Sequence, residues 1–242
     1  MAQKQLSYKF EIDKGKELTL SLSHGVFIPT GTTKTLVKSV QEYVGEPKKM
    51  LDLGCGSGIA GLALYKMGLV KPPLYASDLS ERAVESLKKN AGLHDCPVIA
   101  KCGPLFEPWA KEEFDYIVDD VSGVTEEVAK ISPWFNNVPC ASGVDGTSLV
   151  IEVIKQAKTY LNTGGLLFFP VVSFSKVDKI LKAARDNFSR VKQLGHEEWP
   201  LPKEMYQHLP TLKKLQKRGF IQFEEKFGMV LWFTDVYVAY NH

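Results

Sequence analysis

The sequence has little of what several specialised protein classes require. Its four cysteines, Cys55, Cys96, Cys102 and Cys140, form no CxxC pair, which argues against a disulfide framework and against a zinc cluster. The five histidines show no HExxH spacing, so we expect no metal. No apolar run approaches the ~20 residues of a membrane span, and the polar segment 1–17 does not resemble a secretory signal. We therefore expect a cytoplasmic protein that does not associate with membranes.

An excess of charge of one sign is also missing. The formal net charge is +2, and the only basic cluster, KKLQKRGF at 213–220, is more typical of a solvated helix end than of a nucleic-acid surface. The 44% hydrophobic and 24% charged residues are ordinary for a globular protein. No segment has the composition of a linker, so we expect one globular domain: residues 25–242, with 1–24 as an N-terminal extension. Nothing in the composition predicts the oligomeric state.

The segment LDLGCGSGIAG, Leu51–Gly61, predicts a ligand site. Its glycines Gly54, Gly56 and Gly58 permit positive φ and allow bare peptide groups to approach a ligand. Apolar residues predict a buried strand before these glycines and a helix after them: Met50, Leu51 and Leu53, then Ile59, Leu62 and Ala63. A ligand is therefore expected at the start of this helix.

Two nucleotide-type ligands use such a turn, and their charges differ. A dinucleotide brings a pyrophosphate, which favours free amides and a nearby cation. S-adenosylmethionine carries a sulfonium and an ammonium group, which tolerate an acid such as Asp52, and no Lys or Arg lies between Leu51 and Tyr65. Asp78 ends the next apolar segment, at about the ~20-residue spacing expected for a carboxylate that binds ribose hydroxyls. The pattern favours S-adenosylmethionine over a nicotinamide dinucleotide.

Alternating strand and helix patterns predict an α/β fold with a doubly wound, mainly parallel seven-stranded sheet. Before it, YKFEI and ELTLSL flank DKGK and predict an N-terminal β-hairpin. Thr32 or Thr33 is the expected N-cap of the following helix. The approach to this helix passes Phe27 and Pro29, which we expect beside the ligand pocket.

Two further passages predict functional residues. The segment FDYIVDD is a buried strand that ends in Asp119 and Asp120, and open α/β sheets bind ligands at the carboxyl ends of central strands. We expect one or both carboxylates to take part in catalysis. The irregular stretch 132–146 brings Trp134 and Phe135, and long irregular loops in compact domains are often functional.

Four passages resemble the catalytic domain of the release-factor glutamine methyltransferases and their small-methyltransferase relatives: 25–36, 51–58, 114–120 and 141–171. The resemblance covers roughly residues 25–188. It implies a Rossmann-like methyltransferase fold, S-adenosylmethionine as cofactor, and a nitrogen acceptor on protein or nucleic acid. It further implies that Gly54, Gly56 and Gly58 cradle the cofactor, that Asp78 holds the ribose, and that Pro29 and Thr33 belong to the approach loop.

The chain departs from this family at two positions. Where the family has Asn-Pro-Pro-Tyr after the fourth strand, the sequence reads Asp120-Val121-Ser122-Gly123. Asp120 can still accept hydrogen bonds from an NH₂ group, while the stacking ring is lost and Trp134 or Phe135 is the candidate replacement. Pro104 replaces the acid that usually meets the adenine amino group, so the backbone at Leu105 is expected there. The cofactor-binding set is completed by Asp52, Cys55, Leu79 and Thr33.

Three interpretations remain open from the sequence. The chain is an active methyltransferase with a different acceptor, in which Asp119 or Asp120 is a base or an orienting group. Alternatively, it is a catalytically inactive S-adenosylmethionine-binding partner or sensor. The third interpretation is an NAD(P)-dependent oxidoreductase, although the chain has no Tyr-x-x-x-Lys pair. The sequence does not identify the acceptor, which can be a protein, an RNA or a small molecule.

Overall fold

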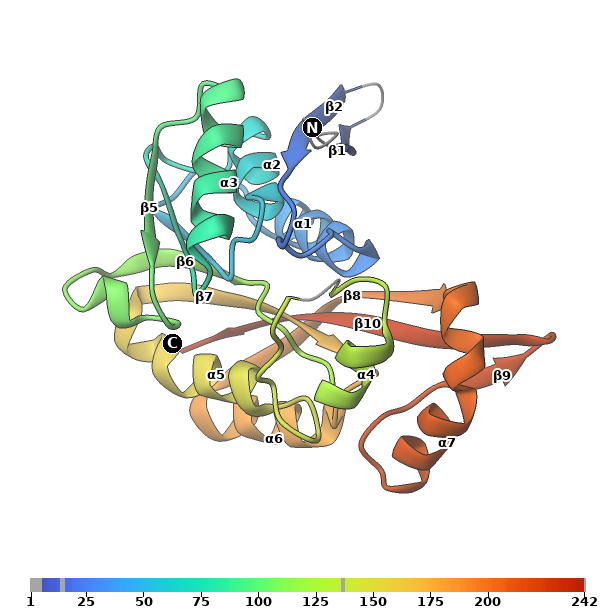
Figure 1. The fold of residues 1–242 in the computed structure, drawn as a ribbon. Helices are drawn as coiled ribbons and strands as arrows, with labels where there is room; N and C mark the ends of the chain where they lie inside the picture. Colours follow the sequence, from blue (N-terminus) through green and yellow to red (C-terminus); the bar gives the residue numbers. More distant parts are fainter. Residues whose placement is uncertain (1–5, 14–15, 136–137, 242) are drawn as a thin grey trace.

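The computed structural model describes residues 6–13, 16–135 and 138–241. Its centre is one sheet with the strand order β5-β4-β3-β6-β7-β10-β8, and β9 pairs with β10 at one end (Figure 1). The strands are β3 (Met50–Leu53), β4 (Leu74–Asp78), β5 (Val98–Cys102), β6 (Phe114–Asp119), β7 (Leu161–Val172), β8 (Arg190–Pro200), β9 (Glu224–Lys226) and β10 (Met229–Tyr240). The five strands β3, β4, β5, β6 and β7 are parallel, and β10 runs antiparallel to its neighbours. The predicted seven-stranded sheet is confirmed, with the three-residue β9 added to it.

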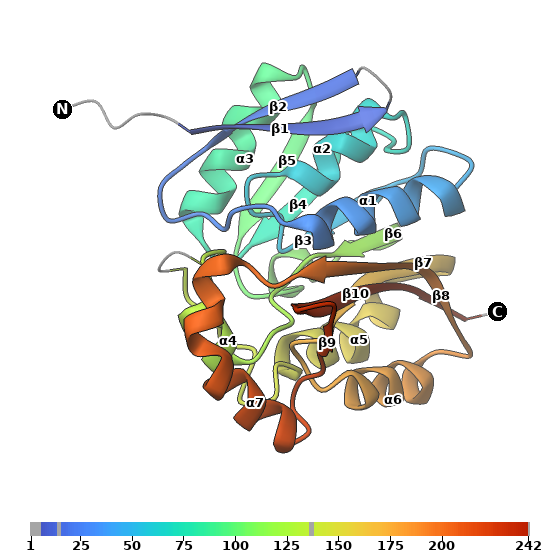
Figure 2. The ribbon, with the colours of Figure 1, turned by 90° about the vertical axis from the view of Figure 1, so that its right-hand side faces the viewer.

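Helices cover both faces of the sheet, as a doubly wound fold requires (Figures 1 and 2). One layer holds α1 (Gly31–Tyr43), α2 (Ile59–Lys66) and α3 (Glu81–Leu93), and the other holds α5 (Ser148–Tyr160) and α6 (Val177–Asn187). Helix α5 buries residues at helical spacing: Val150, Val153, Ile154 and Ala157. None of the helices in the described ranges combines the length and the apolar character needed to cross a bilayer.

The expected N-terminal hairpin is present as β1 (Leu6–Asp13) and β2 (Lys16–Leu22), which form a separate antiparallel pair. It lies over α2 and α3, on the side away from the sheet (Figure 2). Asn90 of α3 exchanges hydrogen bonds of 2.9 and 3.1 Å with the backbone of Ser21 and donates a third to the Ser57 carbonyl. The hairpin is thereby connected to the glycine loop. The turn predicted at Lys14 and Gly15 lies outside the described residues.

The start of α1 differs from the prediction by two or three residues. Thr30 is the N-cap, and its hydroxyl accepts a hydrogen bond from the Thr32 amide. Thr32 and Thr33 lie inside the first turn of the helix, so neither hydroxyl is the N-cap. The side chain of Thr33 is therefore available for a contact elsewhere.

A third group of elements packs at the carboxyl end of the parallel strands. It contains the helices α4 (Glu126–Ile131) and α7 (Leu209–Lys217) and the 3₁₀ helix η2 (Lys203–His208). A second 3₁₀ helix, η1 (Glu107–Trp109), does not belong to this group. Figure 2 shows α4 and α7 together at this end of the sheet. Their shared hydrophobic cluster includes Val128, Phe135, Leu212, Leu215 and Trp232. This cluster joins two segments that lie about 80 residues apart in the sequence and places them beside the ends of β3 and β6.

Candidate functional site

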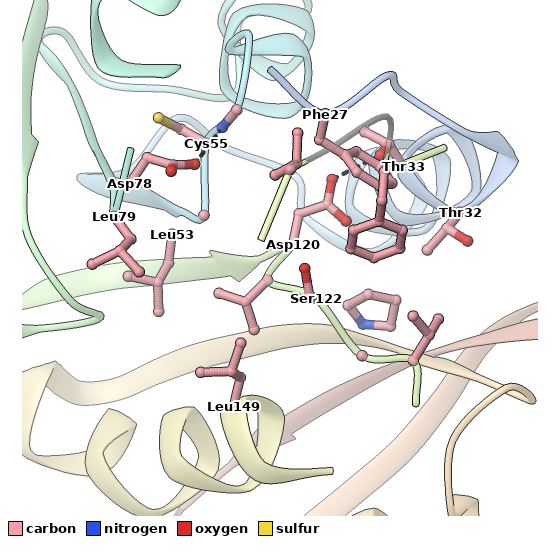
Figure 3. Close-up of a pocket in the computed structure, with 18 of the residues that line it drawn as sticks. Phe27, Thr32, Thr33, Leu53, Cys55, Asp78, Leu79, Asp120, Ser122 and Leu149 are labelled. Carbon is pink, nitrogen blue, oxygen red and sulfur yellow. Dashed lines mark hydrogen bonds between the residues drawn. The ribbon is translucent and has the colours of Figure 1, made fainter. Parts of the chain in front are cut away.

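A cavity of about 260 Å³ lies at the carboxyl ends of the parallel strands, beside the first turn of α1 (Figure 3). Its walls come from segments that are far apart in the sequence, within 27–33, 53–59, 77–79, 103–105, 120–124, 134–135 and 138–141, together with Leu149, Pro170, Val172 and Trp232. Open parallel sheets bind their ligands at this edge. The predicted glycine turn and the predicted acceptor-side residues therefore contribute to a single cavity.

The glycine loop is held in place by the neighbouring strand β4. The amides of Gly54 and Cys55 both donate to the Ser77 carbonyl, at 2.9 and 3.0 Å, and the amide of Gly56 donates to Asp78 Oδ2 at 2.9 Å. Gly54 has φ +76°, and a Cβ there would approach the backbone nitrogen of Val121 to 3.0 Å. Gly56 has φ +52°, and a Cβ there would meet no protein atom within 4 Å. Gly56 therefore presents bare backbone next to open space in the cavity wall.

Asp78 lies in the cavity wall beside this loop, as predicted. Its Oδ1 accepts the Ser80 amide at 2.8 Å while Oδ2 accepts the Gly56 amide. Burial raises the pKa of this carboxyl, and the backbone N–H groups act in the opposite direction. A carboxylate has about four lone-pair sites, so Asp78 can still accept two hydroxyl donors. Leu79, which is 71% exposed, and Leu105, with φ +44°, provide apolar surface on the same part of the cavity.

Two residues predicted to bind the cofactor do not line the cavity. Asp52 is fully buried behind the loop, where Oδ2 accepts the Gly61 amide at 3.0 Å and Oδ1 has no partner among the described residues. Burial raises the pKa of Asp52 to about 7. Gly58 is the N-cap of α2, and a Cβ at this position would approach Leu87 Cδ1 to 2.7 Å. Both residues shape the loop from behind.

The adjacent aspartates at the end of β6 face different surroundings. Asp120 lines the cavity, and its Oδ2 accepts a hydrogen bond of 2.7 Å from Thr33 Oγ1 (Figure 3). Asp119 is fully buried outside the cavity wall, where Oδ1 accepts the Val121 amide at 3.1 Å. Asp119 ends β6 and Asp120 follows it, and consecutive side chains of extended backbone point in opposite directions, so only one aspartate of the pair reaches the cavity. Burial raises the pKa of Asp119 well above its usual range and that of Asp120 to about 7, with the Thr33 hydrogen bond opposing the second shift.

Aromatic side chains form the wall on the acceptor side of Asp120. Phe27 and Phe135 meet edge to face with ring centroids 5.0 Å apart, and Trp134 lies 5.1 Å from Trp232. Pro29 lines the same cavity. The four predicted residues of the acceptor pocket are therefore brought together. Trp232, on β10, was not predicted from the sequence because no motif marks it.

The charge of the cavity restricts its ligand. Among the described residues that line it, Asp78 and Asp120 are the only charged side chains, and none is Lys, Arg or His. A pyrophosphate would meet two carboxylates and no cation, whereas a sulfonium or an ammonium group would be stabilised. The bare backbone at Gly56, the carboxylate of Asp78 and the apolar surface near Leu105 fit an adenosyl ligand that carries positive charge. In the described ranges, no three His, Cys, Asp or Glu side chains are grouped to hold a metal ion.

Comparisons with known proteins agree with this chemistry. A family model described as ribosomal protein L11 methyltransferase (PrmA) matches residues 6–124. The release factor glutamine methyltransferase of Thermodesulfovibrio yellowstonii is 29% identical over 164 residues, 64% of this chain and 58% of that protein. A ribosomal protein L11 methyltransferase of Clostridium botulinum is 41% identical over 87 residues, 35% of this chain and 27% of its own length. The chain thus spans less than two thirds of the length of these relatives.

Solved structures share the fold at lower identity. The 16S rRNA N2 G1207 methyltransferase (RsmC) of T. thermophilus, in complex with AdoMet and guanosine, superposes with a TM-score of 0.61. It is 18% identical, and the match covers 98% of this chain and 50% of that chain. The glycine loop and Asp120 both lie within the region that the family model matches.

Proposed function

We propose that the chain is a class I S-adenosylmethionine-dependent methyltransferase and that it transfers a methyl group to an acceptor bound against Asp120. One observation carries the proposal: a single cavity extends from the glycine loop to Asp120, and its charged lining consists of two carboxylates. Such a lining suits a sulfonium ligand and disfavours a pyrophosphate. It therefore argues against the NAD(P)-dependent alternative.

The cofactor half of the cavity is assigned to residues that contact the glycine loop. The amides of Gly54, Cys55 and Gly56 donate to acceptors within the protein, so the loop would contact the amino-acid portion through its carbonyl groups and bare backbone, and Asp78 would hold the ribose hydroxyls. Leu79 and Leu105 would contact the adenine through apolar surface. When bound, S-adenosylmethionine supplies an electrophilic methyl group.

The acceptor half needs few catalytic groups, because methyl transfer by in-line displacement depends mainly on approach geometry. Asp120 orients the acceptor or takes its proton, and the rings of Phe27, Trp134, Phe135 and Trp232 exclude water around it. The described lining residues include no other group that can accept a proton at the acceptor side. Asp120 is thus the residue that we assign to catalysis, and Asp119 supports the end of β6.

A ligand-dependent melting experiment tests the cofactor assignment. S-adenosylmethionine or its demethylated product, at 100 times the dissociation constant, adds roughly 2.7 kcal/mol to the free energy of unfolding. We expect the melting temperature to rise with these two ligands and to stay constant with NADH and NADPH. Stabilisation by a dinucleotide alone would reject the proposal.

A labelling experiment separates an active enzyme from an inactive binding protein. The named relatives are methyltransferases of a ribosomal protein and of a release factor, and the named structural neighbour is a methyltransferase of 16S rRNA. We therefore expect a protein or RNA acceptor when the chain is incubated with labelled methyl donor and fractionated cell extract. Cofactor binding without label in protein, RNA or small molecules would instead favour the inactive partner or sensor.

A further inference from the structure

The hydroxyl of Thr33 makes a contact that helix formation does not require. Thr30 already caps α1 by accepting the Thr32 amide, and Thr33 lies in the first turn of the helix. Its Oγ1 instead donates to Asp120 Oδ2 at 2.7 Å, across 87 residues of sequence (Figure 3). The resemblance to known methyltransferases placed Thr33 near the cofactor, whereas its polar contact in this structure is with the acceptor-side carboxyl.

The surroundings of Asp120 otherwise favour its neutral form. Asp52 on β3 and Asp119 at the end of β6 are neighbouring acids, and among the described residues that line the cavity the only other charged group is Asp78 of β4. Only the Thr33 hydroxyl and the N-terminal end of α1, which carries partial positive charge, favour the ionised form. No hydrogen bond from the described residues reaches Oδ1, so this oxygen remains for a ligand in the cavity.

We propose that Thr33 is a positioning residue, which favours the ionised form of Asp120 by donating to Oδ2 and leaves Oδ1 to accept a proton from the methyl acceptor. The inference rests on the proposed function and adds the acceptor's chemical class. The acceptor brings an N–H or O–H group, as an amine, amide or hydroxyl does, and is not a tertiary amine or a thioether. Its lone pair forms the bond to the methyl carbon while the carbon–sulfur bond breaks with its electron pair staying on sulfur. The proton passes from the acceptor to Oδ1 and then to water.

The titration of Asp120 can be measured without knowing the acceptor. In the 242-residue chain labelled with ¹³C at the aspartate carboxyl carbons, the Asp120 signal is the one lost in Asp120→Asn. We expect a wild-type midpoint of about 7. Thr33→Val removes the donor, and the midpoint should rise by about one unit, because hydrogen bonds to charged groups are among the stronger ones. Thr33→Ser keeps the hydroxyl and should restore the wild-type midpoint.

Thr35→Val is the matched control, because Thr35 donates its hydroxyl to the Gly31 carbonyl at 3.0 Å in the same helix and does not line the cavity. Its titration curve for Asp120 should match that of the wild type. An unchanged midpoint in Thr33→Val, or an equal shift in Thr35→Val, would overturn the inference. Thr33→Ala provides the same comparison should the valine variant fail to fold.

Two further readouts separate this inference from the proposed function. The rise in melting temperature with the demethylated product, which has no sulfonium charge to interact with Asp120, should be the same in wild type, Thr33→Val and Thr35→Val. If no variant and no wild-type sample responds, the proposed function fails. An extract fraction that accepts labelled methyl groups serves as the acceptor for a pH–rate profile. The acid limb of this profile should move to higher pH in Thr33→Val, by the same amount as the Asp120 midpoint. An acid limb that stays in place while cofactor binding is intact would overturn the positioning role alone.

Discussion

Gly56→Ala offers a direct test of the cofactor site. Gly56 lines the cavity with φ +52°, and an added Cβ would meet no protein atom within 4 Å. Gly68, in the turn after α2, has φ +76° and equally open surroundings, and it does not line the cavity. The two alanine variants therefore share the same backbone strain and differ in whether the new methyl group projects next to the ligand.

The expected magnitudes follow from this comparison. Left-handed backbone costs a non-glycine residue about 1–2 kcal/mol, so both variants should lose that stability. For a chain of this size, each 1 kcal/mol lowers the melting temperature by about 2–4 °C. S-adenosylmethionine at 100 times the wild-type dissociation constant should add about 2.7 kcal/mol to Gly68→Ala. A tenfold weaker affinity in Gly56→Ala reduces that increment to about 1.4 kcal/mol.

Differential scanning fluorimetry with and without S-adenosylmethionine measures both quantities in one experiment. Without ligand, the two variants should melt within a few degrees of each other. With ligand, Gly68→Ala should recover the wild-type increment, while Gly56→Ala should show half of it or less. Equal increments in the two variants would refute the assignment of the ligand to this part of the cavity.

Three further outcomes are expected. Asp120→Asn should lower methyl transfer by about 100-fold or more while the S-adenosylmethionine-dependent rise in melting temperature is kept, and unchanged turnover would remove Asp120 from the site. Burial raises the pKa of Asp52 to about 7, so the folded protein holds a proton that the unfolded chain releases near pH 4. As the pH rises from 5 to 7, the free energy of unfolding should therefore fall by up to about 1.4 kcal/mol per pH unit from this group. Urea titrations at several pH values should show a weaker dependence of the free energy of unfolding on pH for Asp52→Asn. Gly31→Ala places a Cβ 2.6 Å from the ring of Trp199 and should cost about 1–3 kcal/mol in the same titration, whereas Gly45→Ala, with no atom within 4 Å, should change little.

The cofactor half of the cavity could be predicted because its signals are local. The strand, the glycines and the helix follow one another within Met50–Lys66, and Asp78 ends the next strand along the chain. Apolar periodicity and glycine spacing reveal such units without knowledge of the tertiary structure. Asp52 satisfied the same pattern, yet its carboxyl faces the Gly61 amide behind the loop, a direction that composition alone does not reveal.

The acceptor half could be predicted only in part, because it depends on contacts between distant segments. Thr33 and Asp120 are 87 residues apart, and Trp232 enters the wall because β10 inserts between β7 and β8. Asp119 is the last residue of β6 and Asp120 follows it, and consecutive side chains of extended backbone point in opposite directions, so only one of the two is expected in the cavity.

The two halves of the cavity are held in place by different secondary-structure elements. The glycine loop is fixed by β4 and α3, whereas the aromatic wall belongs to the cluster that α4 shares with the segment 201–232. The residues proposed to bind the methyl donor and those proposed to bind the acceptor therefore belong to different packing units of the protein. Replacing the segment between α4 and α5, which contributes Trp134 and Phe135 to the cavity wall, should change which acceptors fit and leave the glycine loop unchanged.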